Sequence, residues 1–239
     1  MMETTVGVGI PTYNRLESLK KTINSLKENT TIRYDLMVAV DGANDGTIDW
    51  LNENKYEYVS QNRQGVCAAK NHILRRFSKY DYIFIVEDDV RFMKPNVFSI
   101  YIEAIRKFQI HHFNFLIPSQ RIKAKPPRKM GNLEVMYSRL LGGCFSTYTK
   151  EIVRKVGGFN PKFKGYGHGH CEYTLRIARA RLTSPWHQFA HLVNSEQYIY
   201  HSDHKTSNTK EEILQQKNKN HEILKESLRN SKLIYMPLV

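Results

Sequence analysis

Residues 82–89 have the sequence Tyr-Ile-Phe-Ile-Val-Glu-Asp-Asp, and this stretch decides the fold. A run of large apolar residues that ends abruptly is typical of an interior strand of a parallel sheet, because such a strand is buried on both faces. Three carboxylates, Glu87, Asp88 and Asp89, follow directly. Alternate side chains of a strand face the same way, so we expect Glu87 and Asp89 to point together into a cleft. Neighbouring like charges raise one another's energy unless a cation compensates them. The run therefore favours a bound divalent ion, Mg²⁺ or Mn²⁺, over the alternative of a solvated strand end.

Two earlier apolar runs end in the same way. Residues 6–10 alternate valine and isoleucine with glycine before a proline, and residues 36–40 end at an aspartate. Between them, leucine and isoleucine recur at helical spacing over about residues 16–28. Strand and helix alternate to about residue 117, which predicts an α/β fold with a mostly parallel central sheet flanked by helices. Ligands bind beyond the carboxyl ends of such strands, so we expect one site from the polar segments 11–15, 41–45 and 87–89.

The remaining elements follow from apolar spacing and from breakers. We expect a short helix capped by Thr47, a strand near 56–60, helices over 66–77 and 97–108, a strand over 113–117 and a terminal amphipathic helix over 211–228. Arg121–Lys129, with the sequence Arg-Ile-Lys-Ala-Lys-Pro-Pro-Arg-Lys, is predicted as a loop, because its prolines and charges do not suit the core of a strand. No repeat or linker divides the chain, so we expect a single domain over residues 1–239.

The net charge is +13, and it is concentrated in one part of the chain. Residues 121–180 carry 13 basic and 3 acidic side chains, whereas residues 1–60 carry 6 basic and 9 acidic ones. This asymmetry indicates a polyanionic partner: nucleic acid, a phosphorylated glycan or an anionic membrane surface met peripherally. The alternative is a surface that only keeps the protein in solution.

Several classes of protein are disfavoured by the composition. No stretch approaches the ~20 consecutive apolar residues of a membrane-spanning helix, and residues 1–6 lack the basic and apolar regions of a secretion signal. The three cysteines, Cys67, Cys144 and Cys171, form no C-x-x-C pair, which argues against a disulfide scaffold and a structural zinc site. We therefore expect a cytoplasmic protein. The sequence does not indicate an oligomeric state.

Four segments resemble, in order and spacing, successive motifs of the family-two nucleotide-sugar glycosyltransferases of GT-A fold. They are Val6-Gly-Val-Gly-Ile-Pro-Thr-Tyr-Asn-Arg15, Val40-Asp-Gly-Ala-Asn-Asp-Gly-Thr47, Asn62-Arg-Gln-Gly65 with Ala69-Lys-Asn71, and Tyr82-Ile-Phe-Ile-Val-Glu-Asp-Asp89. Gly142-Gly143 and Val156-Gly-Gly-Phe-Asn-Pro161 resemble later, acceptor-side motifs. The resemblance implies a Rossmann-like GT-A fold with a nucleotide-sugar-binding half (about 1–117), an acceptor-side half (about 118–205) and a helical tail (206–239).

The resemblance also implies roles for the residues of the donor site. Uracil and ribose would lie against Pro11, Thr12, Tyr13 and Arg15, and Asp41 would bond a nitrogen of the base. Residues 87–89 match the family's Asp-x-Asp motif, with Asp89 as the direct ligand of Mn²⁺ or Mg²⁺ and Asp88 or Glu87 reaching the ribose. Lys70 replaces the usual arginine, so its contact with the donor phosphate or sugar would be less bidentate. His201, or His204 in its place, matches the histidine that completes the metal site.

The chain departs from the family at Gly165-Tyr-Gly-His-Gly-His-Cys-Glu-Tyr173. Family members show Glu-Asp here, and that aspartate is the base that takes the acceptor proton. Gly169 and His170 align with the pair, so the candidates for the base are His170, Glu172 and His168. An imidazole whose pKa lies near neutrality suits such a role, and the alternative is that these residues bind acceptor or metal, or begin a helix.

The sequence therefore predicts a metal-dependent glycosyltransferase that moves a sugar from a UDP-sugar to a hydroxyl of an anionic acceptor, a bacterial or viral surface glycan. The acceptor would contact Lys123, Lys125, Arg128 and Lys129. One alternative acceptor is a hydroxylated base of nucleic acid, as in phage-type DNA modification, which would have to be flipped out of a duplex. A second alternative is an inactive relative of GT-A fold that only binds. A sugar nucleotidyltransferase is disfavoured, because Pro11-Thr-Tyr-Asn stands where that class has a glycine-rich loop.

Overall fold

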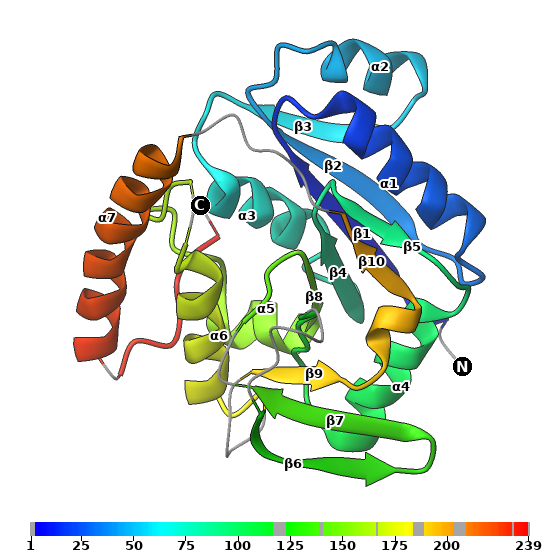
Figure 1. Ribbon diagram of the computed structural model, residues 1–239, viewed down its shortest axis with the longest axis vertical. Coiled ribbons are helices and arrows are strands. Elements are labelled where there is room, and N and C mark those ends of the chain that lie inside the picture. The colour runs from blue at the N-terminus through cyan, green and yellow to red at the C-terminus, as the bar shows by residue number, and fades with distance from the viewer. Residues whose placement is uncertain are drawn as a thin grey trace.

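The main sheet of the protein is mostly parallel. A computed structural model describes residues 3–116, 123–138, 141–165, 167–183, 189–202, 209–230 and 232–238. The strands lie in the order β3-β2-β1-β4-β8 (Figure 1), and all neighbours are parallel except β4 and β8. Their bounds are β1 (Val6–Thr12), β2 (Asp35–Asp41), β3 (Glu57–Gln61), β4 (Tyr82–Val86) and β8 (Phe145–Thr149). The predicted α/β fold is confirmed.

Helices pack on both faces of this sheet. Their bounds are α1 (Leu16–Glu28), α2 (Thr47–Glu53), α3 (Val66–Arg76), α4 (Val97–Phe108), α5 (Lys150–Val156), α6 (Gly169–Arg179) and α7 (Lys210–Arg229). One core cluster joins the sheet to α1 and α4, and a second joins it to α3, α5 and α6. Strand β1 is buried at all seven positions for this reason. A Cβ atom on its Gly9 would lie 2.1 Å from Ile73 of α3, so the helix packs this closely only because the residue is glycine.

Two smaller sheets cover one end of the molecule. One has the order β6-β7-β9, with β6 (Lys123–Met130), β7 (Leu133–Ser138) and β9 (Ala190–Leu192), and the other pairs β10 (Ile199–His201) with β5 (Val90–Phe92). The prediction of a loop over 121–129 was therefore wrong where the structure describes the chain. Strand β6 lies at the edge of its sheet and pairs irregularly with β7, and an edge strand tolerates prolines and charges because one side needs no partner.

Two smaller expectations were also wrong. Residues 113–116 form no strand but a single bridge from Asn114 to Ser146, because their backbone bonds go alternately to β8 and to Ala190 of β9. The cap of α2 is Gly46 instead of Thr47; the Thr47 amide and hydroxyl both donate to Asp45. The helices and strands expected over 16–28, 36–40, 56–60, 66–77, 82–86, 97–108 and 211–228 are confirmed to within a few residues.

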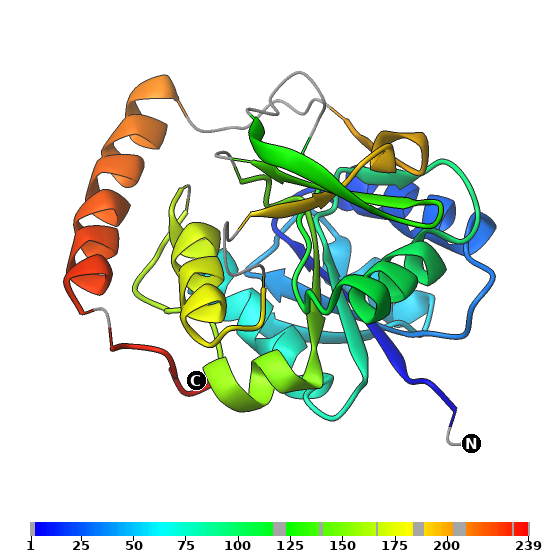
Figure 2. The same cartoon turned by 90° about the horizontal axis from the view of Figure 1, so that it is seen from below.

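The last residues of the described chain return to its middle. Helix α7 packs against α6 on the side away from the main sheet (Figure 2). The segment after α7 then forms a bridge between Met236 and Gly157, and the Gly158 amide donates to the Met236 carbonyl at 2.8 Å. A Cβ atom on Gly157 would lie 1.8 Å from that carbonyl oxygen, so the glycine is needed for this contact. None of the described helices has the length and apolarity to cross a membrane.

Candidate active site

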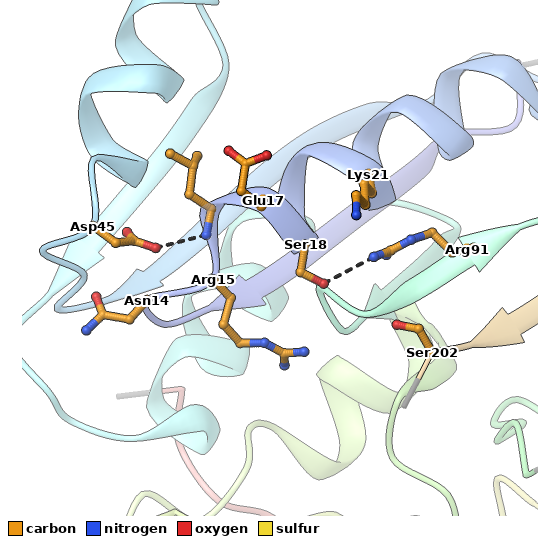
Figure 3. A pocket seen from close by; sticks show the side chains of 9 residues that line it. Asn14, Arg15, Glu17, Ser18, Lys21, Asp45, Arg91 and Ser202 are labelled. Atoms are coloured by element: carbon orange, nitrogen blue, oxygen red, sulfur yellow. Dashed lines mark hydrogen bonds between the residues drawn. The ribbon is translucent and has the colours of Figure 1, made fainter. Parts of the chain in front are cut away.

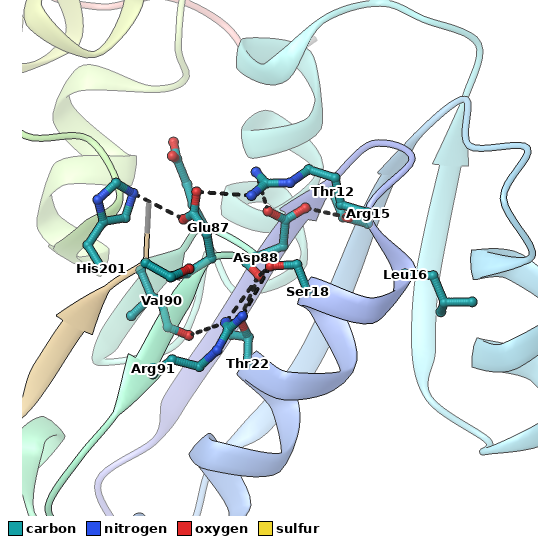
Figure 4. Close-up of polar contacts among 12 residues, drawn as sticks. Thr12, Arg15, Leu16, Ser18, Thr22, Glu87, Asp88, Val90, Arg91 and His201 are labelled. Atoms are coloured by element: carbon teal, nitrogen blue, oxygen red, sulfur yellow. Dashed lines mark hydrogen bonds and ion pairs between the residues drawn. The ribbon is translucent and has the colours of Figure 1, made fainter. Parts of the chain in front are cut away.

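The polar ends of β1 and β4 meet as predicted. The Thr12 hydroxyl donates to Asp88 Oδ2 at 2.6 Å. Arg15, the residue just before α1, places its guanidinium across two carboxylates (Figure 4), with Nη1 2.7 Å from Asp88 Oδ1 and Nη2 3.2 Å from Asp89 Oδ2. The main-chain carbonyl of Asp88 accepts bonds from the hydroxyls of Ser18 and Thr22, both at 2.7 Å. The first turns of α1 therefore hold the acidic turn in place.

The acidic run is oriented differently from the expectation. Strand β4 ends at Val86, and the chain turns so that the Val90 amide donates to the Glu87 carbonyl. The alternation of a strand therefore does not apply, and the expected pairing of Glu87 with Asp89 is wrong. Asp88 and Asp89 both face Arg15, whereas Glu87 accepts a bond from Lys70 Nζ at 3.0 Å. Lys70 comes from α3 and is only 4% exposed.

The two aspartates are buried carboxylates. Asp88 is 3% exposed and Asp89 is 0% exposed. Burial raises the pKa of Asp88 to about 7, against the opposing effects of Arg15 and the Thr12 hydroxyl. A buried carboxylate needs a cation or strong donors nearby to stay ionised, so this turn is built to hold positive charge.

The C-terminal part of the chain brings His201 to the same place. Strand β10 runs antiparallel to β5, which puts His201 opposite Val90. His201 Nε2 lies 3.3 Å from Asp89 Oδ1, and the amide and hydroxyl of Ser202 both donate to the Asp89 carbonyl. His204 lies outside the described residues.

The donor atoms at this position fit a divalent ion that arrives with phosphates. Among the residues that the structure describes, no group of three or more His, Cys, Asp or Glu side chains is arranged to hold a metal. Asp89 and His201 together offer carboxylate oxygen and imidazole nitrogen. Mg²⁺ and ions like it are commonly bound by one or two carboxylates, with water and substrate phosphates as the other ligands. The residues present therefore fit such an ion.

The ends of β1 and β2 line the neighbouring part of the site. Asp41 accepts bonds from Gln61 Nε2 at 2.7 Å and from the Gly65 amide at 3.0 Å. The guanidinium of Arg63 lies 3.9 Å from the ring centroid of Tyr13. The sequence reasoning missed Arg63, although it sits inside the quoted Asn62-Arg-Gln-Gly65 motif. Pro11 is buried within β1, paired with β2.

A cavity of about 600 Å³ opens beside this cluster. It is lined by the start of α1, by Arg91 of β5 and by Ser202, and Arg15 forms part of its wall (Figure 3). Asp45 closes one end by accepting the Leu16 amide at 2.9 Å. The Arg15 side chain is 26% exposed, so its guanidinium lies between the buried carboxylates and solvent.

Glu172 is placed where it cannot reach an acceptor. Its carboxylate is fully buried and makes two bonds with Arg176, one turn further along α6, at 2.7 and 3.0 Å. Ser227 of α7 donates to it at 3.0 Å. Arg176 also donates to the carbonyls of Val156 and Gly158. The suggestion of Glu172 as the base is therefore corrected, because this carboxylate joins α6 to α5 and α7.

The two histidines of the same segment lie in different surroundings. His168 precedes α6, and its ring packs 5.2 Å from that of His221 on α7. His170 lies between Tyr148 and Gly143, with Nε2 3.4 Å from the Tyr148 hydroxyl. Although His170 is partly exposed, its Nδ1 atom is buried and has no hydrogen-bond partner among the described residues. Burial, with Lys70 and His112 nearby, holds its pKa well below 6.5, so the imidazole is neutral.

The four basic residues of 123–129 are spread along an edge strand. The register pairs Lys123 with Ser138 and Lys129 with Glu134, which separates the two lysines by roughly 20 Å at about 3.3 Å per residue. The guanidinium of Arg128 lies 5.9 Å from the ring of Phe108, at the end of α4. The four residues therefore lie along the length of β6, at the edge of the small sheet (Figure 1), and do not form one compact cluster.

Comparison with known proteins identifies the family. The family described as "Glycosyl transferase family 2" matches residues 7–164, which is more than half of the chain. The chain therefore belongs to glycosyl transferase family 2 and is a glycosyltransferase of GT-A fold. It is 24% identical over 192 residues to "Uncharacterized glycosyltransferase R363" of Acanthamoeba polyphaga mimivirus, a match that covers 74% of each chain.

Solved structures share the fold. GalNAc-T7 with UDP, GalNAc and Mn²⁺ matches with a TM-score of 0.66 and 13% identity, over 93% of this chain and 48% of that one. Mannosyltransferase PcManGT from Pyrobaculum calidifontis with GDP-Man and Mn²⁺ matches with a TM-score of 0.56 and 14% identity, over 75% of this chain and 53% of that one. This chain thus spans about half the length of these two enzymes.

Removal of the Glu172 charge should destabilise the protein. In Glu172→Gln, Arg176 stays buried without its counter-charge, and we expect the free energy of unfolding to fall by about 3 kcal/mol. Urea denaturation followed by circular dichroism measures the change. Glu222→Gln, which breaks an exposed pair with Lys225 on α7, is the matched control and should leave the midpoint almost unchanged. If Glu172→Gln is as stable as the wild type but transfers no sugar, the structural role is wrong and Glu172 is again a candidate for the base.

Proposed function

We propose that this glycosyltransferase moves a sugar from a UDP-sugar to a hydroxyl of an anionic acceptor, with Mn²⁺ or Mg²⁺ bound. The observation that carries the proposal is that Asp88, Asp89 and His201 cluster beyond the end of β4, while Asp41 and Tyr13 lie at the same ends of the neighbouring parallel strands β2 and β1. A carboxylate and imidazole that would hold a cation, with an aromatic ring and a further carboxylate at the same edge of the sheet, would suit a nucleoside diphosphate. The three cysteines are free thiols, which suits a reducing compartment such as the cytoplasm.

The nucleoside would bind at the ends of β1 and β2. Asp41 offers a carboxylate to a ring N–H of uracil, and Tyr13 offers a face on which a base can stack. Thr12 and Asp88 lie deeper and would meet the ribose. Relatives of this fold are described with both UDP and GDP-Man, so competition by UDP, GDP and other nucleotides tests the choice of uracil.

The leaving diphosphate would lie between Asp89 and Lys70. When bound at Asp89 and His201, a divalent ion supplies a positive charge that stabilises the departing diphosphate. Lys70, held at 3.0 Å from Glu87, would supply a further positive charge toward the phosphate or the sugar. With this charge in place, the remaining side chains have to orient the acceptor hydroxyl and take its proton.

Asp89→Asn should lose metal-dependent activity. We expect turnover to fall by orders of magnitude, and UDP affinity in the presence of Mn²⁺ to fall with it, because a direct ligand of a hard ion loses its charge. UDP release and calorimetric titration measure the two effects. Asp81→Asn, at the opposite end of β4 and paired with Lys150, is the matched control. Unchanged turnover in Asp89→Asn, or full activity of the wild type in excess EDTA, would contradict the metal site.

His170 remains as the base among the three candidates. The imidazole of His170 is partly exposed and neutral, so it would take the proton of the acceptor hydroxyl as that hydroxyl attacks the anomeric carbon. Its Nδ1 atom, which is buried and has no hydrogen-bond partner among the described residues, would become accessible by a turn of the ring when the acceptor binds. Glu172 is committed to Arg176, and His168 packs on His221. Gly143 packs closely against His170 Nδ1, because a Cβ atom on it would lie 3.2 Å from the nitrogen.

His170→Gln should reduce transfer by about 10²- to 10⁴-fold while UDP affinity stays near that of the wild type. A base must be neutral, and the lowered pKa of His170 keeps it neutral into mild acid. Protonation of His170 should therefore lower the wild-type rate only below pH 6.5, whereas an acid limb near pH 7 would report protonation of Asp88. Stopped assays across pH measure this, with His221→Gln as the control. Near-normal turnover in His170→Gln would place the base elsewhere.

The anionic acceptor would lie along β6. Its positive charges extend over roughly 20 Å, which suits a chain of repeated anionic units better than one small phosphate. A surface glycan with phosphates and a nucleic acid with a hydroxylated base both fit that description. An inactive relative would bind UDP-sugar but would neither hydrolyse nor transfer it, so hydrolysis of the donor without acceptor excludes that alternative.

The salt dependence of acceptor binding should distinguish these acceptors. For nucleic acid, the logarithm of the affinity should fall steeply with the logarithm of salt concentration, whereas a short phosphorylated glycan should show a shallow slope. Replacing Lys123, Lys125, Arg128 and Lys129 by Gln should flatten the slope by about one unit for each phosphate that the protein no longer neutralises. The same replacement of Lys210, Lys217, Lys219 and Lys225 on α7 is the control. Affinity insensitive to salt and to both variants would show that the charge of β6 only solubilises the protein.

A further inference from the structure

Arg15 already contacts Asp89, the carboxylate that would bind a metal ion, and its neighbour Asp88. One nitrogen of its guanidinium lies 2.7 Å from Asp88 and the other 3.2 Å from Asp89 (Figure 4). The contact is therefore a fork that spans two residues and neutralises part of the charge of both. Asp88 and Asp89 are almost fully buried. When no metal ion is bound, the guanidinium of Arg15 therefore stabilises their negative charge.

The position of Arg15 is fixed by its backbone, while its side chain has space to move. The Arg15 carbonyl accepts the Leu19 amide at 2.9 Å, and Asp45 holds the next amide, that of Leu16. The guanidinium borders the 600 Å³ cavity. The Arg15 side chain is 26% exposed, whereas the side chains of Asp88 and Asp89 are 4% and 0% exposed. A modest rotation of the side chain would carry it away from the carboxylates without a change in the fold.

A divalent ion at Asp89 and the guanidinium in this position repel one another. Two like charges a few ångströms apart, beside buried groups, interact strongly because little water screens them. A diphosphate offers the guanidinium another partner, since arginine binds phosphate oxygens in the same forked geometry as carboxylates. The metal ion alone must therefore displace Arg15, whereas a metal ion with a diphosphate provides Arg15 with a new place to bind.

We propose that Arg15 is an internal counter-ion of Asp88 and Asp89 that competes with the divalent ion at Asp89, so that metal binds weakly alone and tightly together with the nucleotide diphosphate. This inference rests on the proposed metal- and UDP-dependent activity of the same site. The coupling is reciprocal, so it also strengthens the binding of UDP in the presence of metal.

The test is the affinity for Mn²⁺, measured by electron paramagnetic resonance of the free ion, with and without UDP. In Arg15→Gln, we expect the Kd of Mn²⁺ without nucleotide to fall by about tenfold, and the factor by which UDP improves it to shrink by about the same amount. Arg15→Lys keeps the charge but lacks the fork, so its Kd should lie between those of the wild type and Arg15→Gln. Lys21→Gln removes one positive charge from the same cavity wall and should stay within about twofold of the wild type.

The possible outcomes separate this inference from the proposed function. If Arg15→Gln and Arg15→Lys bind Mn²⁺ without UDP no more tightly than the wild type, the competition does not exist, even where the wild type binds Mn²⁺ with UDP. If Lys21→Gln tightens Mn²⁺ binding as much as Arg15→Gln, the effect is one of general charge and the inference is overturned. If the wild type binds no Mn²⁺ even with UDP, the proposed metal site fails and the inference fails with it. Should Arg15→Gln not fold, Arg15→Lys still decides the question.

Discussion

The charge on two buried carboxylates, those of Asp88 and Asp89, is the constraint on which the site depends. A carboxylate removed from water costs on the order of several kcal/mol unless donors or cations surround it. The chain supplies these from elements far apart in sequence: Thr12 from β1, Arg15 from the start of α1 and His201 from β10. The backbone of the same turn is held by hydroxyls from Ser18 and Ser202. The two halves of the protein therefore meet at this one turn, and each is positioned by it.

The sequence was sufficient for the elements whose burial is regular. Strands β1, β2 and β4 and helices α1, α3 and α4 have clear apolar periods because each buries one or both faces against the same core. It was not sufficient where backbone geometry changes within a motif. The direction of Glu87 depends on the turn that follows Val86, and nothing in the letters Glu-Asp-Asp distinguishes a turn from one more strand residue. The edge strand β6 was not predicted for a different reason. Its prolines and charges are typical of a loop, and an edge strand tolerates them because one of its sides has no partner strand.

The structure also places two candidates for the base, His170 and Glu172, on different sides of α6. His170 and Glu172 are two positions apart on α6, and such residues project from a helix about 200° apart. Both could not face one cleft. Glu172 and Arg176 are four positions apart, a spacing that predicts an ion pair on a helix. This spacing alone could have excluded Glu172 as the base. The contact of Arg63 with Tyr13, in contrast, joins two loops and has no counterpart in local spacing.

The return of the chain to Gly157 has a consequence for the order in which the protein forms during synthesis. The main sheet is complete once Thr149 has been made, and domains begin to fold from the N-terminal side as the ribosome extends them. The contacts of Met236 with Val156 and Gly158 at the end of α5, and that of Arg176 on α6 with the Ile234 carbonyl, need residues made almost 90 positions later. A nascent chain can thus complete its main sheet before the residues that tie down α5 and α6 have been made, and a chain truncated before Ile234 would keep the first without the second.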